Sequence, residues 1–414
     1  MTPTRRDGGR WLVATTEYAG LTAYTGGIGT HYAGLAPALV AAGAQVDLLV
    51  VAPGPLLSDR APGGVHLLAS AAVPGSGVAA LSRRAHVVAS AARRGRYDRV
   101  FLPEWGALGA RLPARAPVLT NLATSTALQN AVAGFTPASF GWRQGTVQVV
   151  QSFLETRQIR RSAGLIAIST AMADRTRRTL GEVPPLRVVP NTVDVAQVRR
   201  LAGAGPTPTW WPGAAGPVIL FVGRLERRKG VLTATEAFAR VAAAHPDVQL
   251  VLAGASGDAR FEPDRDELLC AVPPAARSRV HLVGHLSAEQ LHPCVRAATL
   301  VLCPSVWEGF GNAALEARAI GAPVVVTRGS GFDDFCTDGR DALVVDPGDV
   351  GELARAVTRL LAEPALRERL GRAAATSADD YAPERVAPLL LDAADELLGA
   401  LTGRTYGATS PRPR

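Results

Sequence analysis

Lysine is nearly absent from this 414-residue sequence: it occurs once, at Lys229, and arginine supplies every other basic residue. This bias, together with abundant alanine, glycine and proline, is typical of a GC-rich bacterial genome, in which arginine replaces lysine wherever it can. Arginine serves as well as lysine on a solvated surface. The one lysine that remains therefore indicates a position where a compact point charge is needed.

Long apolar runs and paired cysteines are also missing. No run of about 18 apolar residues occurs, which excludes a transmembrane helix. The charged N-terminus has too short an apolar stretch for a signal peptide. None of the four cysteines belongs to a CxxC pair, and a chain of this length needs no disulfides to fold. We therefore expect a reduced, cytoplasmic protein.

The net charge of +8 is scattered along the chain, without a dense basic tract or basic–aromatic alternation. This distribution argues against nucleic acid as a partner. A small anionic ligand or an anionic membrane surface fits the charge as well. Arg83, Arg84, Arg93 and Arg94 flank an apolar helical stretch that could touch anionic lipid, although a solvated face is the simpler explanation. We expect at most weak membrane contact.

Short apolar runs alternate with helical stretches along almost the whole chain. Their nearly continuous apolar character is typical of strands buried on both faces of a parallel sheet, and the alternation predicts an α/β fold. The expected strands are Trp11–Thr15, Gln45–Val51, Arg99–Leu102, Val118–Thr120, Leu165–Ile168, Val218–Val222, Val248–Ala253, Val280–Val283, Leu300–Cys303 and Val324–Thr327.

The segment Gly203–Pro217 is rich in proline and glycine and is expected to be a linker. It predicts two doubly wound Rossmann-like domains, 1–203 and 204–382. Ligands of such sheets bind beyond the carboxyl ends of the strands, so two facing domains would share a central cleft. The amphipathic stretch 383–403 is expected to be a helix that packs back on the N-terminal domain, and 404–414 a disordered tail.

Thr25–Gly29 (TGGIG) follows the first expected strand and precedes a helix, where glycines let backbone amides approach a phosphate. A dinucleotide fingerprint would need a third glycine, which is Tyr32 here, although Asp47 lies at about the right distance to imitate the ribose-binding acid. The missing glycine disfavours a Rossmann dehydrogenase. A plain tight turn also explains the segment.

Val222–Gly230 (VGRLERRKG) follows the first strand of the second half. Arg224 and Lys229 are five residues apart at a strand end, where the two cations could clamp a diphosphate. The alternative is an ordinary solvated basic loop. The single lysine argues against that alternative.

Pro304–Asn312 (PSVWEGFGN) leaves another strand and leads into a helix over Ala313–Ile320. Glu308 lies in the loop and Glu316 on the helix, eight positions later. The glycines leave backbone amides bare at the helix N-terminus, where an anion is favoured. One carboxylate could reach a reacting sugar while the other accepts hydrogen bonds from ribose. Otherwise Glu308 would interact with the helix dipole and Glu316 with solvent.

VGRLERRKG followed by PSVWEGFGNAALEARAIGAPVV resembles family 4 of the retaining glycosyltransferases, which have the GT-B architecture. Val189–Asp194 (VPNTVD) resembles the family segment before the interdomain linker, and Thr25–Gly29 resembles its N-terminal glycine loop. The resemblance covers essentially the whole chain. It implies an enzyme that moves a sugar from a nucleotide diphosphate sugar and needs no metal or other cofactor.

The resemblance also implies roles for individual residues. Arg224 and Lys229 match positions that bind the donor diphosphate, Glu308 contacts the transferred sugar near the reacting carbon, and Glu316 binds the ribose. The remaining implied donor-binding residues are Gly26, Gly27, His285, Leu286, Gly309, Phe310, Gly311, Asn312 and Ala313.

One position departs from the family pattern. Ala123 stands where members commonly have a histidine at a strand end of the N-terminal domain, so that hydrogen bond to the donor sugar has no partner here. The neighbouring residues predict a pocket for sugar or acceptor. Its members are Glu104, Trp105, Ala123, Thr124 and Ser125.

Two patterns imitate metal sites without the context that such sites need. Asp264-Arg265-Asp266 imitates a metal-binding DxD motif, but it lies in a polar stretch that is expected to start a helix. His281 and His285 flank a strand end and have no third ligand, which argues against zinc. We expect no metal.

Together these features predict a retaining glycosyltransferase that moves a hexose-type sugar, from UDP by preference, to a hydroxyl of a small-molecule or natural-product acceptor. One alternative is a glycosyltransferase that assembles glycolipids or polysaccharides at a membrane surface. Another is an inactive module that only binds nucleotide sugars, which the intact motifs argue against. The oligomeric state has no signal in the sequence.

Overall fold

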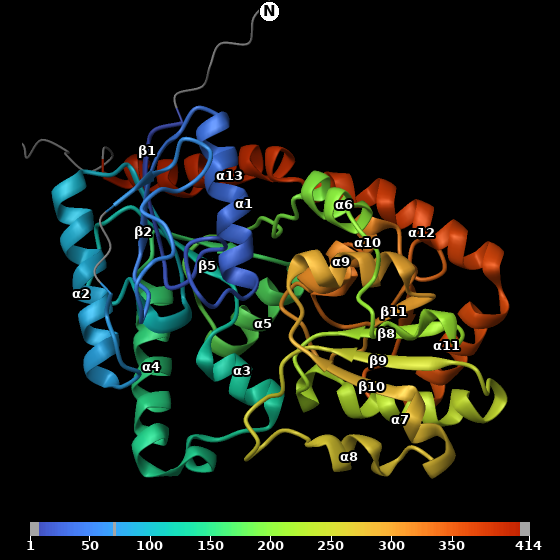
Figure 1. Cartoon of the computed structure of the whole chain (residues 1–414). Coiled ribbons are helices and arrows are strands. Elements are labelled where there is room, and N and C mark those ends of the chain that lie inside the picture. The colour runs from blue at the N-terminus through green and yellow to red at the C-terminus, as the bar shows by residue number, and fades with distance from the viewer. Residues whose placement is uncertain (1–7, 69–71, 406–414) are drawn as a thin grey trace, which may run out of the picture. The chain divides into compact units, whose positions relative to one another are not determined.

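The fold is described from a computed structural model, which describes residues 8–68 and 72–405. The chain forms two compact units: unit 1 is Met1–Thr192 with Pro383–Arg414, and unit 2 is Val193–Ala382. The prediction of two doubly wound α/β units is confirmed, because each contains one parallel sheet with crossover helices (Figure 1).

The sheet of unit 1 has the strand order β3-β2-β1-β4-β5-β6-β7, and every pairing in it is parallel. Apolar side chains cover both faces, as the unbroken apolar runs require. The strands are β1 (Arg10–Thr15), β2 (Gln45–Val50), β3 (His66–Leu67), β4 (Arg99–Pro103), β5 (Val118–Leu122), β6 (Gly164–Ala167) and β7 (Leu186–Val188). The helices are α1 (Gly27–Ala41), α2 (Val78–Gly95), α3 (Thr126–Ala133), α4 (Gly141–Arg161), α5 (Thr170–Leu180) and α13 (Pro383–Thr405).

Unit 2 has the strand order β10-β9-β8-β11-β12-β13, also parallel throughout. The strands are β8 (Val218–Val222), β9 (Gln249–Ala253), β10 (Val280–Gly284), β11 (Leu300–Cys303), β12 (Val324–Thr327) and β13 (Leu343–Val345). The helices are α6 (Val195–Gly203), α7 (Val231–Ala244), α8 (Arg265–Cys270), α9 (Ala288–Ala297), α10 (Asn312–Ile320), α11 (Val350–Ala362) and α12 (Pro364–Ala378).

The boundary between the units lies at Thr192–Val193, not at residue 203. Helix α6 buries Val195, Val198 and Ala202 and packs against α9 and α10, so it belongs to unit 2. The proline- and glycine-rich segment 203–217 therefore lies within unit 2. Its composition indicated an irregular segment between two domains. The boundary lies earlier because helix α6, which precedes this segment, packs into the core of unit 2.

Helix α13 packs against α1 and β6 of unit 1. Its apolar side chains, among them Val386, Leu390 and Leu397, join the same core as Trp11 and Tyr32. The helix continues to Thr405, past the expected start of the tail at residue 404. The rest of that expected tail, 406–414, lies outside the described residues.

Candidate functional site

The basic loop after β8 places one of its two predicted cations, Lys229, against a carboxylate from another loop. Lys229 ends the short 3₁₀ turn Arg227–Lys229, and its Nζ contacts the Glu308 carboxylate. Gly230 next to it has φ 73°, and a Cβ there would lie 1.9 Å from the Pro304 carbonyl oxygen, so only glycine allows this approach. The amide of Val306 also donates to the Arg228 carbonyl (2.8 Å). The structure thus brings together the second and third sequence motifs.

Glu308 is a charged carboxylate in a largely buried position. Burial raises the pKa of its carboxyl, but the charges of Lys229 and Arg228 outweigh that effect and hold the pKa below its usual value. Arg228 Nη1 lies 4.0 Å from Glu308 Oε2. Glu308 therefore stays ionised at neutral pH and depends on these cations.

Glu226, which the sequence analysis did not single out, connects the arginines of this loop. Its buried carboxylate pairs with Arg224 Nη1 (2.6 Å) and with Arg228 Nε (2.8 Å). Arg224 stays half-exposed while this anchor holds one edge of its guanidinium. The remaining donors of Arg224 can therefore meet an anionic ligand in a fixed direction.

Contacts with the segment 331–335 support the loop between Glu308 and α10. The amide of Gly331 donates to the Glu308 carbonyl (2.9 Å). Gly311 has φ 108°, and a Cβ there would lie 2.2 Å from the Phe332 ring. Phe310 is buried against Phe335, with ring centroids 5.1 Å apart. These contacts fix the backbone from Gly309 to Asn312 at the N-terminus of α10, where anions are favoured.

Glu316 lies on α10 and is paired with a residue that the sequence analysis missed. His292 Nε2 on α9 lies 3.5 Å from Glu316 Oε2, and the histidine ring is buried while the carboxylate is partly exposed. His292 thus orients the side chain that the family resemblance assigns to the ribose. Nothing in its local sequence indicated this role, because its partner is 24 residues away.

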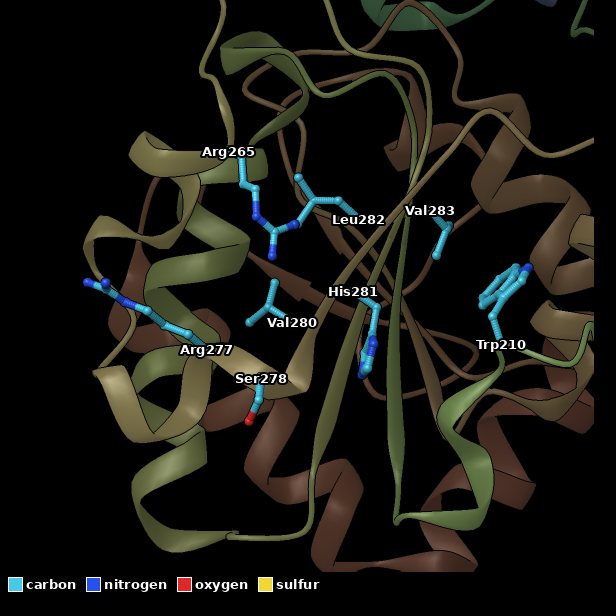
Figure 2. Close-up of a pocket in the computed structure, with 8 residues that line it drawn as sticks. All are labelled: Trp210, Arg265, Arg277, Ser278, Val280, His281, Leu282 and Val283. Atoms are coloured by element: carbon cyan, nitrogen blue, oxygen red, sulfur yellow. The ribbon is translucent and has the colours of Figure 1, made fainter.

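The turn after β10 carries two predicted donor-binding residues, His285 and Leu286. His285 is exposed and Leu286 is buried. A cavity of about 510 Å³ lies beside β10 (Figure 2), but neither residue lines it. Its lining residues are Trp210, Arg265, Arg277, Ser278, Val280, His281, Leu282 and Val283.

In unit 1, the glycine loop before α1 already holds an internal anion. The amides of Gly26 and Gly29 donate to the Glu17 carboxylate, at 3.1 and 2.8 Å. The amide of Gly26, which was predicted to bind the donor, therefore donates its hydrogen bond to Glu17 in this structure. The sequence predicts a phosphate at this helix N-terminus, and in the structure a carboxylate of the chain itself lies there.

The predicted sugar or acceptor pocket of unit 1 contains a buried carboxyl. Glu104 Oε2 accepts a hydrogen bond from the Ala123 amide (2.8 Å), and the side chain is 1% exposed. The Thr124 hydroxyl donates to the Ala123 carbonyl. Ser125 caps α3 by accepting from the Leu128 amide (3.3 Å), so its hydroxyl serves the helix.

A second buried carboxylate, Glu155, lies beside these residues and was not predicted. It accepts hydrogen bonds from the amides of Gly106 (3.0 Å) and Thr126 (2.7 Å). It thereby ties α4 to the segment around the partly buried Trp105 and to the start of α3. Glu155 stood within an ordinary helical pattern, which gave no signal of this role.

We expect Glu104→Gln to change how stability depends on pH. Burial raises the pKa of Glu104 to about 8, and Glu155 pushes it in the same direction. An unfolded glutamate titrates near pH 4.3, so between about pH 4.3 and 8 the folded chain keeps a proton that the unfolded chain has lost. Stability from this group therefore falls as pH rises through that window. Glu104→Gln should flatten the fall in melting temperatures measured across it.

The exposed Glu182 provides the control for that experiment. Glu182→Gln should leave the pH dependence of the melting temperature as it is in the unchanged protein. Equal slopes for Glu104→Gln and the unchanged protein would contradict the raised pKa.

Within the described ranges, no group of three or more metal-ligating side chains occurs. Asp264 caps α8 by accepting from the Glu267 amide (2.8 Å), which agrees with a helix start for the Asp264–Asp266 motif. His281 Nε2 contacts Gln249 Oε1 at 3.0 Å. Among the described residues, no helix is both long enough and apolar enough to cross a bilayer.

Curated relatives match part of the chain. Glycogen synthase of Mycobacterium tuberculosis is 32% identical over 245 residues, covering 56% of this chain and 54% of that protein. An alpha-D-kanosaminyltransferase of Streptomyces kanamyceticus is 36% identical over 184 residues, covering 44% and 45%. The chain thus spans about half the length of the curated relatives it matches.

Solved structures share the fold over nearly the whole chain. Sucrose-phosphate synthase from Thermosynechococcus elongatus has a TM-score of 0.70 at 21% identity, covering 97% of this chain and all of that one (100%). HepE of Anabaena, in complex with UDP and glucose, has a TM-score of 0.64 at 19% identity and covers 94% of this chain and 100% of its own.

Family models match both halves of the sequence. The Glycosyltransferase Family 4 model matches residues 25–197, and the glycosyl transferases group 1 model matches residues 214–377. These ranges include the glycine loop, the basic loop and both glutamates of the third motif. The chain belongs to glycosyltransferase family 4, with the GT-B fold.

Proposed function

We propose that this protein is a retaining glycosyltransferase that moves a hexose-type sugar from a nucleotide diphosphate sugar, by preference a UDP-sugar, to a hydroxyl of a small-molecule or natural-product acceptor. The observation that carries the proposal is the contact between Lys229 and the ionised Glu308 in unit 2, with Arg224 held nearby by Glu226. This arrangement offers positive charge for a diphosphate and a carboxylate for the sugar.

The leaving diphosphate gains negative charge as the glycosidic bond breaks. Arg224 and Lys229 would neutralise that charge by preorganised contacts, which is the effective form of electrostatic catalysis. The amides at the N-terminus of α10 would bind the same anionic group. These cations would do the work that a divalent metal does elsewhere, so we expect no metal requirement.

Glu308 and Glu316 would bind opposite ends of the donor. Glu308, kept ionised by its cations, would contact the transferred sugar and favour positive charge near the reacting carbon. Glu316, oriented by His292, would accept hydrogen bonds from the ribose hydroxyls. In a retaining transfer the acceptor attacks the same face of the sugar from which the leaving group departs. A phosphate oxygen of the donor can therefore take the acceptor's proton.

The names of the relatives, a glycogen synthase and a kanosaminyltransferase, point to very different substrates. We place the reaction in the cytoplasm, because the four cysteines are free thiols, which that compartment keeps reduced.

The proposed function is tested by donor binding and by turnover. We expect UDP to raise the melting temperature more than GDP, ADP or dTDP, because a ligand that binds only the folded state stabilises it by mass action. With a UDP-hexose and a panel of hydroxyl acceptors, transfer should retain the anomeric configuration and should persist in EDTA. Inverted product, or activity that EDTA abolishes and Mn²⁺ restores, would overturn the mechanism. Binding without turnover on any acceptor would favour the inactive binding module.

A further inference from the structure

A groove on unit 1 is separate from every residue assigned to the donor. It runs between α2 and α4, which lie side by side in Figure 1, and it has a volume of about 730 Å³. The segment 110–113 forms the rest of its wall. The lining residues are Val78, Ser82, Ala85, His86, Ala89, Arg93, Ala110, Arg111, Leu112, Pro113, Leu154, Arg157 and Arg161. None of them is acidic.

The two helices that border the groove carry a strongly one-sided charge. Each contains four arginines, and the only acidic residue on either helix is Glu155, which is fully buried. Arg93, Arg157 and Arg161 are exposed at the groove and have no ion-pair partner within the described part of the chain. Elsewhere in the fold exposed arginines commonly pair with carboxylates, as Arg227 does with Glu267. Unpaired cations on this face indicate an anionic partner from outside.

An exposed apolar stripe continues from the groove along α4. Trp142 is 79% exposed and Phe153 is 65% exposed, with the exposed Val149 between them. Their spacing of seven and four residues places all three on one face of the helix. Arg157 follows Phe153 by one turn, so the stripe and the basic groove meet. Large apolar side chains at this exposure are a feature of interaction surfaces when they gather on one element.

We propose that the face formed by α2 and α4 binds the surface of an anionic membrane. The arginines would contact lipid phosphates, and Trp142 and Phe153 would enter the boundary between headgroups and acyl chains, where amphipathic aromatic rings are favoured. RNA would match the arginines but would leave Val149 and Phe153 without an apolar environment. The inference goes beyond the proposed function, because it concerns where the enzyme works and holds for any donor.

The test uses the full chain and vesicles of stated composition. In co-sedimentation, the protein should bind vesicles of phosphatidylcholine with phosphatidylglycerol and should stay in solution with phosphatidylcholine alone. High salt should release it, because screening shortens the reach of the anionic surface. Binding to single-stranded RNA in place of the anionic vesicles, or equal binding to both kinds of vesicle, would overturn the proposal.

Two sets of variants then locate the contact. Arg93→Glu with Arg157→Glu should weaken binding to anionic vesicles by about twentyfold or more, since each basic residue near such a surface contributes about fivefold. Trp142→Ser with Phe153→Ser should also weaken binding, although the charge is unchanged. All four residues are exposed, so melting temperatures should remain close to that of the unchanged protein.

The matched control is Arg177→Glu with Arg178→Glu on α5, which makes the same change in net charge on another exposed face of unit 1. We expect it to keep most of the vesicle binding. An equal loss in the control would show that only net charge matters, and unchanged binding in both groove variants would exclude this face.

Discussion

Lys229→Ala is expected to lower kcat/KM by about tenfold to over a hundredfold, because it removes a charged partner of the leaving diphosphate. It also removes the cation that contacts Glu308. Without it, burial should raise the pKa of the Glu308 carboxyl, so the acidic limb of the pH–rate profile should move to higher pH. Steady-state kinetics across pH with the donor found by thermal shift would measure both effects.

Arg227 offers a matched control within the same loop. Its side chain is directed to the Glu267 carboxylate, with Nη2 2.7 and 2.8 Å from the two oxygens, and has no contact with Glu308 among the described residues. Arg227→Ala should therefore change kcat/KM only slightly and should leave the acidic limb in place. If both variants lose activity alike, the loop acts through its overall charge and Lys229 has no special role.

The strands that the sequence predicted are those with buried, continuous apolar runs. All ten expected runs are strands in the structure, and their ends agree with the observed ones to within two residues. The sequence missed β3, β7 and β13. Each is two or three residues long and forms an edge of its sheet. A run of two or three residues shows no measurable hydrophobic periodicity. Such a segment becomes a strand because it forms hydrogen bonds with the neighbouring strand.

The sequence indicated candidate site residues through their type and spacing, but it did not indicate the partners that the fold gives them. The lone lysine and the two glutamates were visible because their type and spacing are unusual. Glu17 and His292 were not, because each acts through a contact that the folded arrangement of loops and helices creates. Glu226 pairs with Arg224 and Arg228, two positions away on either side, but a short run of mixed charges does not indicate which of its ion pairs form. Glu17 shows the difference most clearly. The glycine loop predicted an anion at α1, but no local pattern indicated that the chain would provide it.

The largest effect on stability is expected at a buried ion pair that supports the loop carrying Glu308. Arg318 on α10 is 0% exposed, and its Nη1 donates to Asp341 Oδ1 (2.9 Å). The same Asp341 oxygen accepts from the Thr337 amide (2.8 Å). The Arg318 guanidinium also lies over the Phe335 ring, 5.6 Å from its centroid. Phe335 in turn packs on Phe310, so this pair supports the loop that carries Glu308.

Asp341→Ala should lower the free energy of unfolding of unit 2 by about 3–5 kcal/mol, because it leaves the Arg318 charge buried without a counter-ion. The backbone carbonyl at position 341 (3.0 Å) and the Ser377 hydroxyl (2.7 Å) would still accept hydrogen bonds from the guanidinium. For a unit of this size that corresponds to a fall in Tm of about 6–20 °C in calorimetry. Asp346→Ala is the control, since its pair with Arg328 (3.2 Å) is exposed on both sides and such pairs contribute about 0–1 kcal/mol. The double variant Arg318→Met with Asp341→Leu decides the cause. It should recover much of the loss if the unpaired charge is responsible, whereas a double variant as unstable as Asp341→Ala would show that the pair acts mainly through its hydrogen bonds to the 337–341 loop.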